Sequence, residues 1–456
     1  MSAPDYSLKG DLTNGPVRGH LIRLTIPMIW GLLAIISFQL VDTWYISMLG
    51  TAELAAVSFT FPVTYILFSL VMAQGIAASS VLSRQLGNGS ISRVRRIATH
   101  SLIFAFLSGI VMAIIGLLLM NPLFRAMGAD DTMMPIISDY MTIWFAGSIF
   151  LTIPMVGNSA MRATGDTFTP AMIMTTAAIL NALIAPLLVF GLFGFPRLEV
   201  QGAAIATLLA NIGASMAAFY ILYAKKRMIS RSRLHMKLFG NSIKRLLIIA
   251  IPVSIASIIQ PATGAFLTGL LASHSTEAVA AFGVASRIEA FVFIIIMALA
   301  IGMAPIIGQN WGAGLYDRVH ETLNQAIRFC TWWSLGVAVI LIAAADPLAR
   351  MFSDDPDVIA LTKLYFWVIP ITYAFGNLVQ GWSSAFNAMG KPKQSFVMIF
   401  VKLIVLTIPG AALGSYYYGP AGIFAALALV NIVTGIGFHI ANNRLCRRYE
   451  YSPVPA

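Results

Sequence analysis

Long apolar stretches recur from one end of this chain to the other, and they restrict its fold more than any other feature. Twelve stretches are long enough for a helix to cross a hydrocarbon core of about 30 Å. Their ranges are 21–49, 54–83, 97–120, 134–157, 168–192, 201–224, 246–272, 278–310, 321–345, 359–385, 394–415 and 420–443. A membrane β-strand would be about ten residues long and would alternate apolar with polar side chains, so these continuous runs predict helices.

Composition supports the same class of protein. Only 10% of the residues are charged and the mean hydropathy is +0.83, whereas soluble domains carry about 25% charged residues. The sequence therefore predicts an all-α polytopic membrane protein. Residues 1–20 are polar and lack a short apolar core, so we expect no cleaved signal peptide. Cys330 and Cys446 are too few for a disulfide framework or a metal cluster, and we expect neither a bound metal nor a cofactor.

The net charge of +11 could suggest a nucleic-acid partner, but the placement of the basic residues indicates an orientation signal instead. Arginines crowd the loop after the second span, and the run KKRMISRSRLHMKLFGNSIKR covers residues 225–245 on the same side. By the positive-inside rule this side and both termini are cytoplasmic. We expect a multi-pass protein of the inner (cytoplasmic) membrane that contacts the lipid bilayer, binds no nucleic acid and acts as a monomer.

The chain repeats itself with an offset of about 225 residues. Four motifs of the first half match motifs of the second half in the same order: TIPMI matches AIPVS, RQLGNGS matches QNWGAGL, MRATGD matches FNAMGK, and VQGAAIATLLANI matches GPAGIFAALALVNI. Each repeat holds six spans, which predicts two pseudo-symmetric six-helix bundles related by an axis along the membrane normal. The boundaries are an N-lobe of residues 1–224, a linker of 225–245 and a C-lobe of 246–456. Proline kinks a helix, so Pro27, which matches Pro252 in the other lobe, is the hinge candidate.

One carboxylate stands out at lipid depth in the first lobe. Asp42 shares a helix face with Gln39 and Tyr45 because the three recur at a spacing of three residues. An ionised side chain costs about 3 kcal/mol or more in the bilayer, so this face must point into the protein or into water. Burial favours the neutral form of a carboxylate, which predicts that Asp42 exchanges a proton. Four polar residues of later spans are expected to complete the site: Asn158, Asn181, Thr207 and Asn211.

The second lobe carries a separate polar cluster of Arg287, Glu289 and Lys402. Glu289 and Lys402 both lie near the middle of their spans, where charges are tolerated when they pair. Two interpretations stay open: a structural pair of Glu289 with Lys402 or Arg287, or a second cation site.

The sequence contains no signature of an enzyme. VHETLNQ at residues 319–325 lacks the second histidine of a zinc-protease motif, and neither a Walker A motif nor a Gly-x-Ser-x-Gly elbow is present. We therefore expect no catalytic activity and no use of ATP by this chain.

Taken together, the motifs resemble the multidrug and toxic compound extrusion family, called MATE. The resemblance rests on the six-plus-six repeat, the Ile-Pro that opens the first helix of each lobe, VDTWYISMLG, the paired GNG and GAG turns, and MRATGD answered by NAMGK. It implies two bundles around a central cavity that opens alternately to either side. It also implies export of organic cations in exchange for H⁺ or Na⁺, with Asp42 at the position of the family's coupling aspartate.

Within the family the chain resembles the DinF-type branch more than the NorM-type branch. NorM-like members carry an acidic residue on the seventh helix, where this chain has Gln260. The DinF-type branch often shows Asn-x-x-x-Asp on the fifth helix, whereas Asn181 is followed here by Ala185. The missing carboxylate favours H⁺ over Na⁺ as the coupling ion. The prediction is a multidrug exporter of small-molecule drugs or toxins, and the alternative is a lipid-linked precursor flippase of the same superfamily.

Overall fold

The computed structural model describes residues 11–230 and 233–451, and within them every regular element is a helix, as predicted. The helices of the first half are α1 Val17–Ser47, α2 Thr51–Gly87, α3 Ile91–Ala126, α4 Met133–Ala146, α5 Ser148–Ala163, α6 Phe168–Phe190 and α7 Glu199–Tyr220. Those of the second half are α8 Met236–Ala272, α9 Thr276–Gly312, α10 Tyr316–Ala343, α11 Ala345–Phe352, α12 Pro356–Val368, α13 Tyr373–Ala388, α14 Pro392–Phe400 and α15 Ile408–Tyr451. Two π-helical segments, Ile221–Lys225 and Val401–Thr407, follow α7 and α14.

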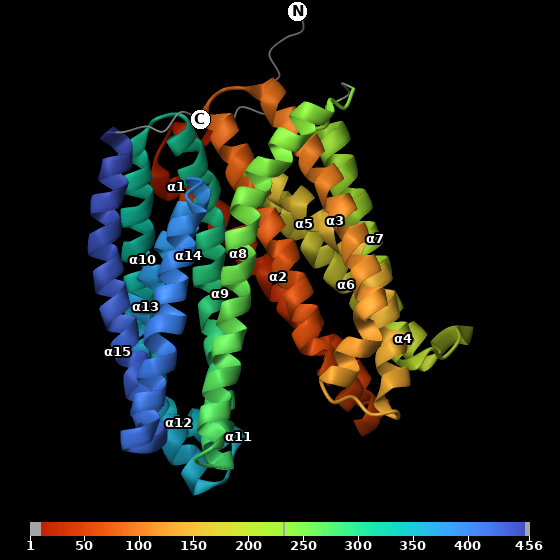
Figure 1. Ribbon diagram of the computed structural model, residues 1–456, viewed down its shortest axis with the longest axis vertical. Helices are drawn as coiled ribbons and strands as arrows, with labels where there is room; N and C mark the ends of the chain where they lie inside the picture. The colour runs from red at the N-terminus through yellow and green to blue at the C-terminus, as the bar shows by residue number, and fades with distance from the viewer. Residues whose placement is uncertain (1–10, 231–232, 452–456) are drawn as a thin grey trace, which may run out of the picture. The chain divides into compact units, whose positions relative to one another are not determined.

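The helices account for the twelve predicted spans. Ten helical segments in the described part of the chain are long and apolar enough to cross a membrane. The pair α4 and α5, bent by 45° at Gly147, adds an eleventh. The segment Pro392–Arg447 counts once among the ten, but it is interrupted at Gly419, whose φ of 59° is not helical. The blue ribbon in Figure 1 turns back within this segment, and a Cβ at Gly410 would lie 3.8 Å from a methyl group of Val430, so this segment supplies two spans.

The chain divides into two compact units, which are described separately. Among the described residues, the first contains 11–14 and Arg23–Ala250, and the second contains Gly15–Ile22 together with the chain from Ile251 onward. The division therefore passes through two helices, α1 and α8, a short way before Pro27 and Pro252. The lobe boundaries at 224 and 246 stay a prediction, and the chain termini and residues 231–232 of the linker lie outside the described residues.

Each unit has its own apolar core. In the first unit Phe124 and Phe145 are almost fully buried between α2, α3, α4 and α7. In the second unit Phe366 and Phe424 occupy the corresponding place among α9, α12 and α15. The outer faces of the helices expose many large apolar side chains, as expected where lipid replaces water.

Two glycines that match between the repeats allow close helix packing. A Cβ at Gly202 of α7 would lie 2.6 Å from the backbone carbonyl of Leu188 on α6. A Cβ at Gly422 would overlap the carbonyl of Gly414 across the turn at Gly419. Small residues let membrane helices approach closely, so the repeated glycine marks the same hairpin contact in each half.

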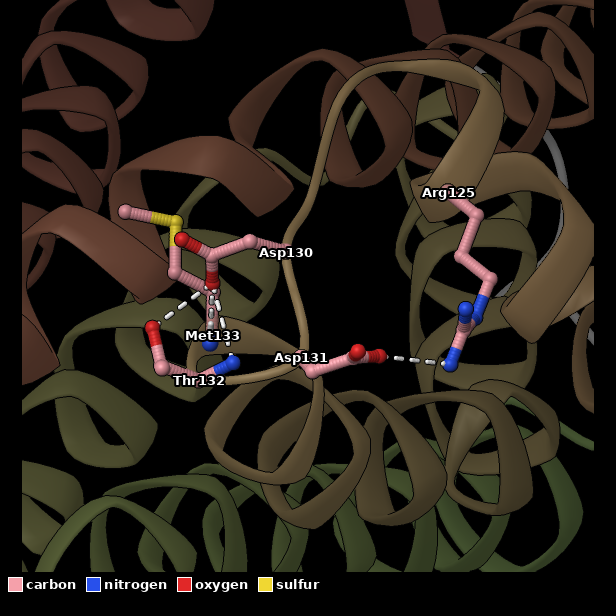
Figure 2. Close-up of polar contacts among 5 residues, drawn as sticks. All are labelled: Arg125, Asp130, Asp131, Thr132 and Met133. Carbon is pink, nitrogen blue, oxygen red and sulfur yellow. Dashed lines mark hydrogen bonds and ion pairs between the residues drawn. The ribbon is translucent and has the colours of Figure 1, made fainter.

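The turn between α3 and α4 is held by an aspartate cap, shown in Figure 2. One Asp130 oxygen accepts hydrogen bonds from the Thr132 amide (3.0 Å), the Thr132 hydroxyl (2.7 Å) and the Met133 amide (2.8 Å). These bonds, the hydroxyl first, lower the pKa of Asp130. Arg125 pairs with Asp131 at 2.9 Å on the same turn. The cap satisfies amides at the start of α4 that have no partner within the helix.

Candidate functional site

Helices α1 and α6 pack side by side and position the predicted coupling residue. Gly31 faces Ala171, since an added Cβ would lie 3.3 Å from the Ala171 Cα. Further along, the Tyr45 hydroxyl donates a hydrogen bond to the Ala182 carbonyl at 3.2 Å. The two contacts advance in the same sense, so the helices run in the same direction. The parallel direction agrees with the number of spans between α1 and α6. These are α2, α3 and the bent pair α4 and α5, and two spans separated by an odd number of spans cross a membrane in the same direction.

Asp42 lies one helical turn before Tyr45, on the face of α1 that this hydrogen bond turns toward α6. Its Oδ1 atom is buried and has no hydrogen-bond partner among the described residues. Tyr140 of α4 is buried and close enough to Asp42 for an electrostatic interaction. A buried carboxylate oxygen without a partner is costly when it is charged, and such a group is a candidate for function at membrane depth.

Asn181 adds a second unpaired oxygen next to the α1 contact. It precedes Ala182 on α6 and is 1% exposed. Its amide donates to the Thr207 hydroxyl at 3.0 Å, and that hydroxyl donates to the Ala203 carbonyl at 3.1 Å. The Asn181 Oδ1 atom is left without a partner in the described part of the chain. Asp42 and Asn181 thus bring unpaired buried oxygens to two helices that touch.

The other predicted residues of the first lobe take separate places. Gln39 is exposed on α1. Asn158 is buried on α5, and its Oδ1 has no partner among the described residues. Asn211 lines a small pocket together with Thr207 and Trp144. The structure therefore links Tyr45, Asn181 and Thr207 to the surroundings of Asp42, and shows no hydrogen bond from Gln39, Asn158 or Asn211 to that group within the described residues.

In the second unit the structure shows two hydroxyl donors to Glu289 and no ion pair of this carboxylate with a described residue. Glu289 Oε1 accepts hydrogen bonds from the Tyr365 hydroxyl at 2.7 Å and the Tyr373 hydroxyl at 2.6 Å. Two hydroxyls from the neighbouring span therefore satisfy the carboxylate without a second buried charge.

The remaining residues of the second-lobe cluster lie apart from this carboxylate. Arg287 is exposed two positions away on α9, and Gln260 is exposed on α8. Lys402 lies in the π-helical segment Val401–Thr407, where its carbonyl accepts from the Thr407 hydroxyl at 2.8 Å. It makes no ion pair with any residue that the structure describes.

Sequence reasoning missed the tyrosines of both sites. In the sequence these tyrosines look like packing residues of apolar spans, because a neutral hydroxyl adds little to the hydropathy pattern. They are Tyr140, Tyr365 and Tyr373. A usable signal existed, since a buried tyrosine usually finds a hydrogen-bond partner for its hydroxyl, and each unit offers a buried carboxylate.

Comparison with known proteins places these features in a family. The MatE family model matches residues 27–187 and 252–413, one segment in each half. The chain is 38% identical over 435 residues to a FAD transporter of Shewanella oneidensis, covering 95% of this chain and 96% of that protein. It is 23% identical over 417 residues to the multidrug export protein MepA of Staphylococcus haemolyticus, covering 91% and 90%. Its fold matches the Vibrio cholerae MATE transporter VcmN in the bent form with a TM-score of 0.89 at 28% identity, covering 95% and 97%.

Proposed function

Because the chain belongs to the MATE family of multi-pass membrane transporters, we propose that it is a secondary active exporter that exchanges a small organic solute for protons. The observation that carries the proposal is the buried Asp42 oxygen without a partner on a helix that contacts α6. Its place is the inner membrane, with the basic linker on the cytoplasmic side. The exporter acts as a monomer.

The proton is taken up and released by Asp42. When the carboxylate is charged, it holds the exporter in the state that binds substrate. Protonation from outside removes the charge, changes the contacts of α1 with α6, and bends α1 near Pro27 so that substrate is released. The region of Asn181 supplies few fixed oxygens for Na⁺, because the helix carries Ala185 one turn further on, and Ala185 is fully buried.

The coupling site belongs to the first lobe. Gln260 stands where the NorM-type branch has a carboxylate, and it cannot take up a proton near neutral pH. The Glu289 carboxylate of the second unit has two hydroxyl donors already, which supports a structural role.

The first substrate to test is FAD or a related flavin nucleotide. The relative named as a FAD transporter is 38% identical to this chain, whereas the drug exporter MepA is 23% identical. A flavin dinucleotide differs from the organic cations of multidrug exporters in the sign of its charge, because its pyrophosphate is doubly negative. This difference gives a physical test.

The membrane potential distinguishes the two substrate classes. Exchange of one inward proton for one outward monovalent cation moves no net charge. Exchange of one inward proton for one outward dianion moves the equivalent of three charges in the favourable direction. Each charge moved through 100 mV contributes about 2.3 kcal/mol, so the dianion exchange gains about 7 kcal/mol. A potential should therefore accelerate flavin export and leave export of a monovalent cation unchanged.

The test uses the purified protein in proteoliposomes loaded with FAD or with the cationic dye ethidium. A pH step, a Na⁺ step and a potassium diffusion potential are imposed separately, and efflux is followed by fluorescence. We expect the pH step and the potential to drive FAD efflux. Asp42→Asn should abolish the pH-driven part, while the exposed control Asp354→Asn should retain it.

Four results contradict the proposal at different points. Normal proton-driven efflux by Asp42→Asn contradicts the role of Asp42 as the group that takes up and releases the proton. Efflux driven by a Na⁺ step but not by a pH step contradicts the assignment of H⁺ as the coupling ion. Efflux of ethidium without efflux of FAD removes the flavin substrate and returns the protein to the multidrug class, and movement of a lipid-linked precursor alone favours the flippase.

A further inference from the structure

One face of α15 runs along α13, and the residues of that face recur every four positions, which places them on one side of the helix. They are Asn431, Gly435, His439 and Asn443, and we call them the α15 stripe. The Asn431 amide donates to the Thr372 hydroxyl at 3.1 Å, where α13 begins. A Cβ at Gly435 would lie 2.5 Å from the Phe375 carbonyl oxygen, so the two helices touch through their backbones.

The histidine of the α15 stripe meets a buried tryptophan of α13. The Trp382 indole Nε1 donates to His439 Nδ1 at 3.2 Å, and the tryptophan side chain is 1% exposed. The other ring nitrogen, Nε2, lies 3.1 Å from the side-chain amide of Asn443. An indole N–H can only donate, so His439 Nδ1 must present its lone pair. The ring is therefore neutral and carries its proton on Nε2, which the amide oxygen of Asn443 can accept after a half-turn of the amide group.

Protonation of His439 is incompatible with this contact. The second ring proton would sit on Nδ1, and two N–H groups would then point at each other. The indole of Trp382 would lose its acceptor while still buried, which costs more than the hydrogen bond itself. Histidine is the side chain whose ordinary titration falls between pH 5 and 8, so the contact is sensitive to pH in the physiological range.

No charged or titratable side chain forms a hydrogen bond or ion pair with the His439 ring within the part of the chain that the structure describes. Those carried by the elements packed against this part of α15 are Tyr373 of α13, Lys393 of α14, Lys402 of the π-helical segment, and Arg444, Cys446 and Arg447 of α15 itself. Tyr373 is already bonded to Glu289. The contact with the indole therefore determines which protonation state of the ring fits the packed helices.

The first unit shows that the fold does not need a titratable pair at this place. In the first half, Phe219 of α7 matches the histidine at an offset of 220, and Gly157 of α5 matches the tryptophan at an offset of 225. The close approach of the two helices is retained there, because the Ser215 hydroxyl donates to the Phe150 carbonyl at 3.1 Å. The histidine and tryptophan thus add pH sensitivity to the second unit alone.

We propose that His439 and Trp382 form a pH-sensitive latch, which holds α15 against α13 when the histidine is neutral and is released when protons accumulate on the side where α15 ends. The effect on transport rests on the proposed function, in which each cycle delivers protons to that side. Alternating access moves a bundle largely as a rigid body, so a loosened contact between α13 and α15 slows the exporter. Asn431 and Gly435 do not titrate and keep the helices together when the latch is open.

The test compares three variants with the wild-type protein. His439→Asn supplies a side-chain oxygen near the position of Nδ1 that accepts from the indole and takes up no proton. Trp382→Phe removes the donor and keeps an aromatic ring. His235→Asn replaces an exposed histidine next to the linker helix and serves as the matched control.

Two measurements do not use transport. The ¹⁵N spectrum of histidine-labelled protein in detergent shows whether Nδ1 of His439 carries a proton, and its signal is identified by its absence in His439→Asn. Thermal unfolding at pH 7.5 and pH 5.5 shows whether the contact is lost in acid. We expect a bare Nδ1 at pH 7.5, and we expect acid to lower the melting temperature of wild type and His235→Asn more than that of His439→Asn or Trp382→Phe.

The third measurement is exchange of FAD across proteoliposomes with the same pH on both sides, so that no pH gradient drives it. Asp42 titrates alike in all variants, and the comparison between them cancels its contribution. Lowering the pH from 7.5 to 5.5 should slow wild type and His235→Asn about fivefold more than His439→Asn, because a net hydrogen bond of about 1 kcal/mol corresponds to a fivefold factor.

The latch is overturned by a proton on Nδ1 of His439 at pH 7.5, or by equal acid effects on the unfolding of wild type and His439→Asn. Equal acid effects on FAD exchange in these two proteins overturn its role in transport. Absence of FAD exchange in every protein at both pH values contradicts the proposed substrate instead, and the spectrum and the unfolding comparison still decide whether the latch exists.

Discussion

The ion pair of Asp166 and Lys226 ties the beginning of the linker to the turn between α5 and α6. The two side chains are 2.7 Å apart and are 18% and 23% exposed. Asp166 also accepts hydrogen bonds from the Thr169 amide at 3.0 Å and the Thr169 hydroxyl at 2.8 Å. Asp166→Asn removes the charge and can keep the amide contact, so it isolates the ion pair from the cap.

The expected loss follows from this geometry. Unit charges about 4 Å apart near a protein surface attract by about 4 kcal/mol, and dehydration with loss of side-chain freedom offsets most of that. A pair this far buried should therefore contribute about 1 to 2 kcal/mol to the free energy of unfolding. Partial burial raises the pKa of Asp166, but the hydrogen bonds from Lys226 and Thr169 outweigh it and leave the pKa below its usual value.

The sign of the pH dependence follows from that lowered pKa. The stabilisation is fully present above the pKa of an unfolded aspartate, about 3.9, and is lost as the pH falls through the lower pKa of the folded state. Thermal and denaturant unfolding of detergent-solubilised wild type, Asp166→Asn, Lys226→Met and the double variant give a coupling energy at each pH. We expect that energy to be present at neutral pH and to vanish in strong acid. A coupling of zero at neutral pH, or one that persists unchanged when Asp166 is protonated, refutes the reasoning.

Three further predictions concern other parts of the fold. Gly422→Ala should destabilise the protein by about 3 kcal/mol because its Cβ would overlap the Gly414 carbonyl, while Gly437→Ala meets open space and should melt like wild type in the same thermal assay. Glu289→Gln should keep proton-driven transport. It should lower the free energy of unfolding by about 1 to 3 kcal/mol, because the hydrogen bonds from the Tyr365 and Tyr373 hydroxyls become weaker. Loss of transport in a stable variant would instead indicate a second cation site. Pro27→Ala should bind substrate normally but transport it more slowly, and an unchanged turnover rate would remove the hinge role.

The sequence predicts the helices and their repetition well because apolar length and matched glycines are properties of the local chain. It also identifies Asp42, since a carboxylate in an apolar run is visible without any structure. The partner of Glu289 could not be predicted, because hydroxyls of Tyr365 and Tyr373 reach it from another span and tyrosine carries no charge to mark it. The bend at Gly147 was missed for a related reason: the run 134–157 is apolar throughout, so hydropathy does not register the change of direction.

The passage of the unit boundary through α1 and α8 means that the covalent halves and the compact units are different sets of residues. A cut in the linker would leave 236–250, with Ser242 and Arg245, on the C-terminal fragment, although this stretch packs with the first unit. Residues 15–22 would likewise remain on the N-terminal fragment, although they group with the second unit. Each fragment would therefore lack a piece of its own bundle and carry a piece of the other. Co-produced fragments should complement each other into one particle, whereas either fragment alone should be degraded.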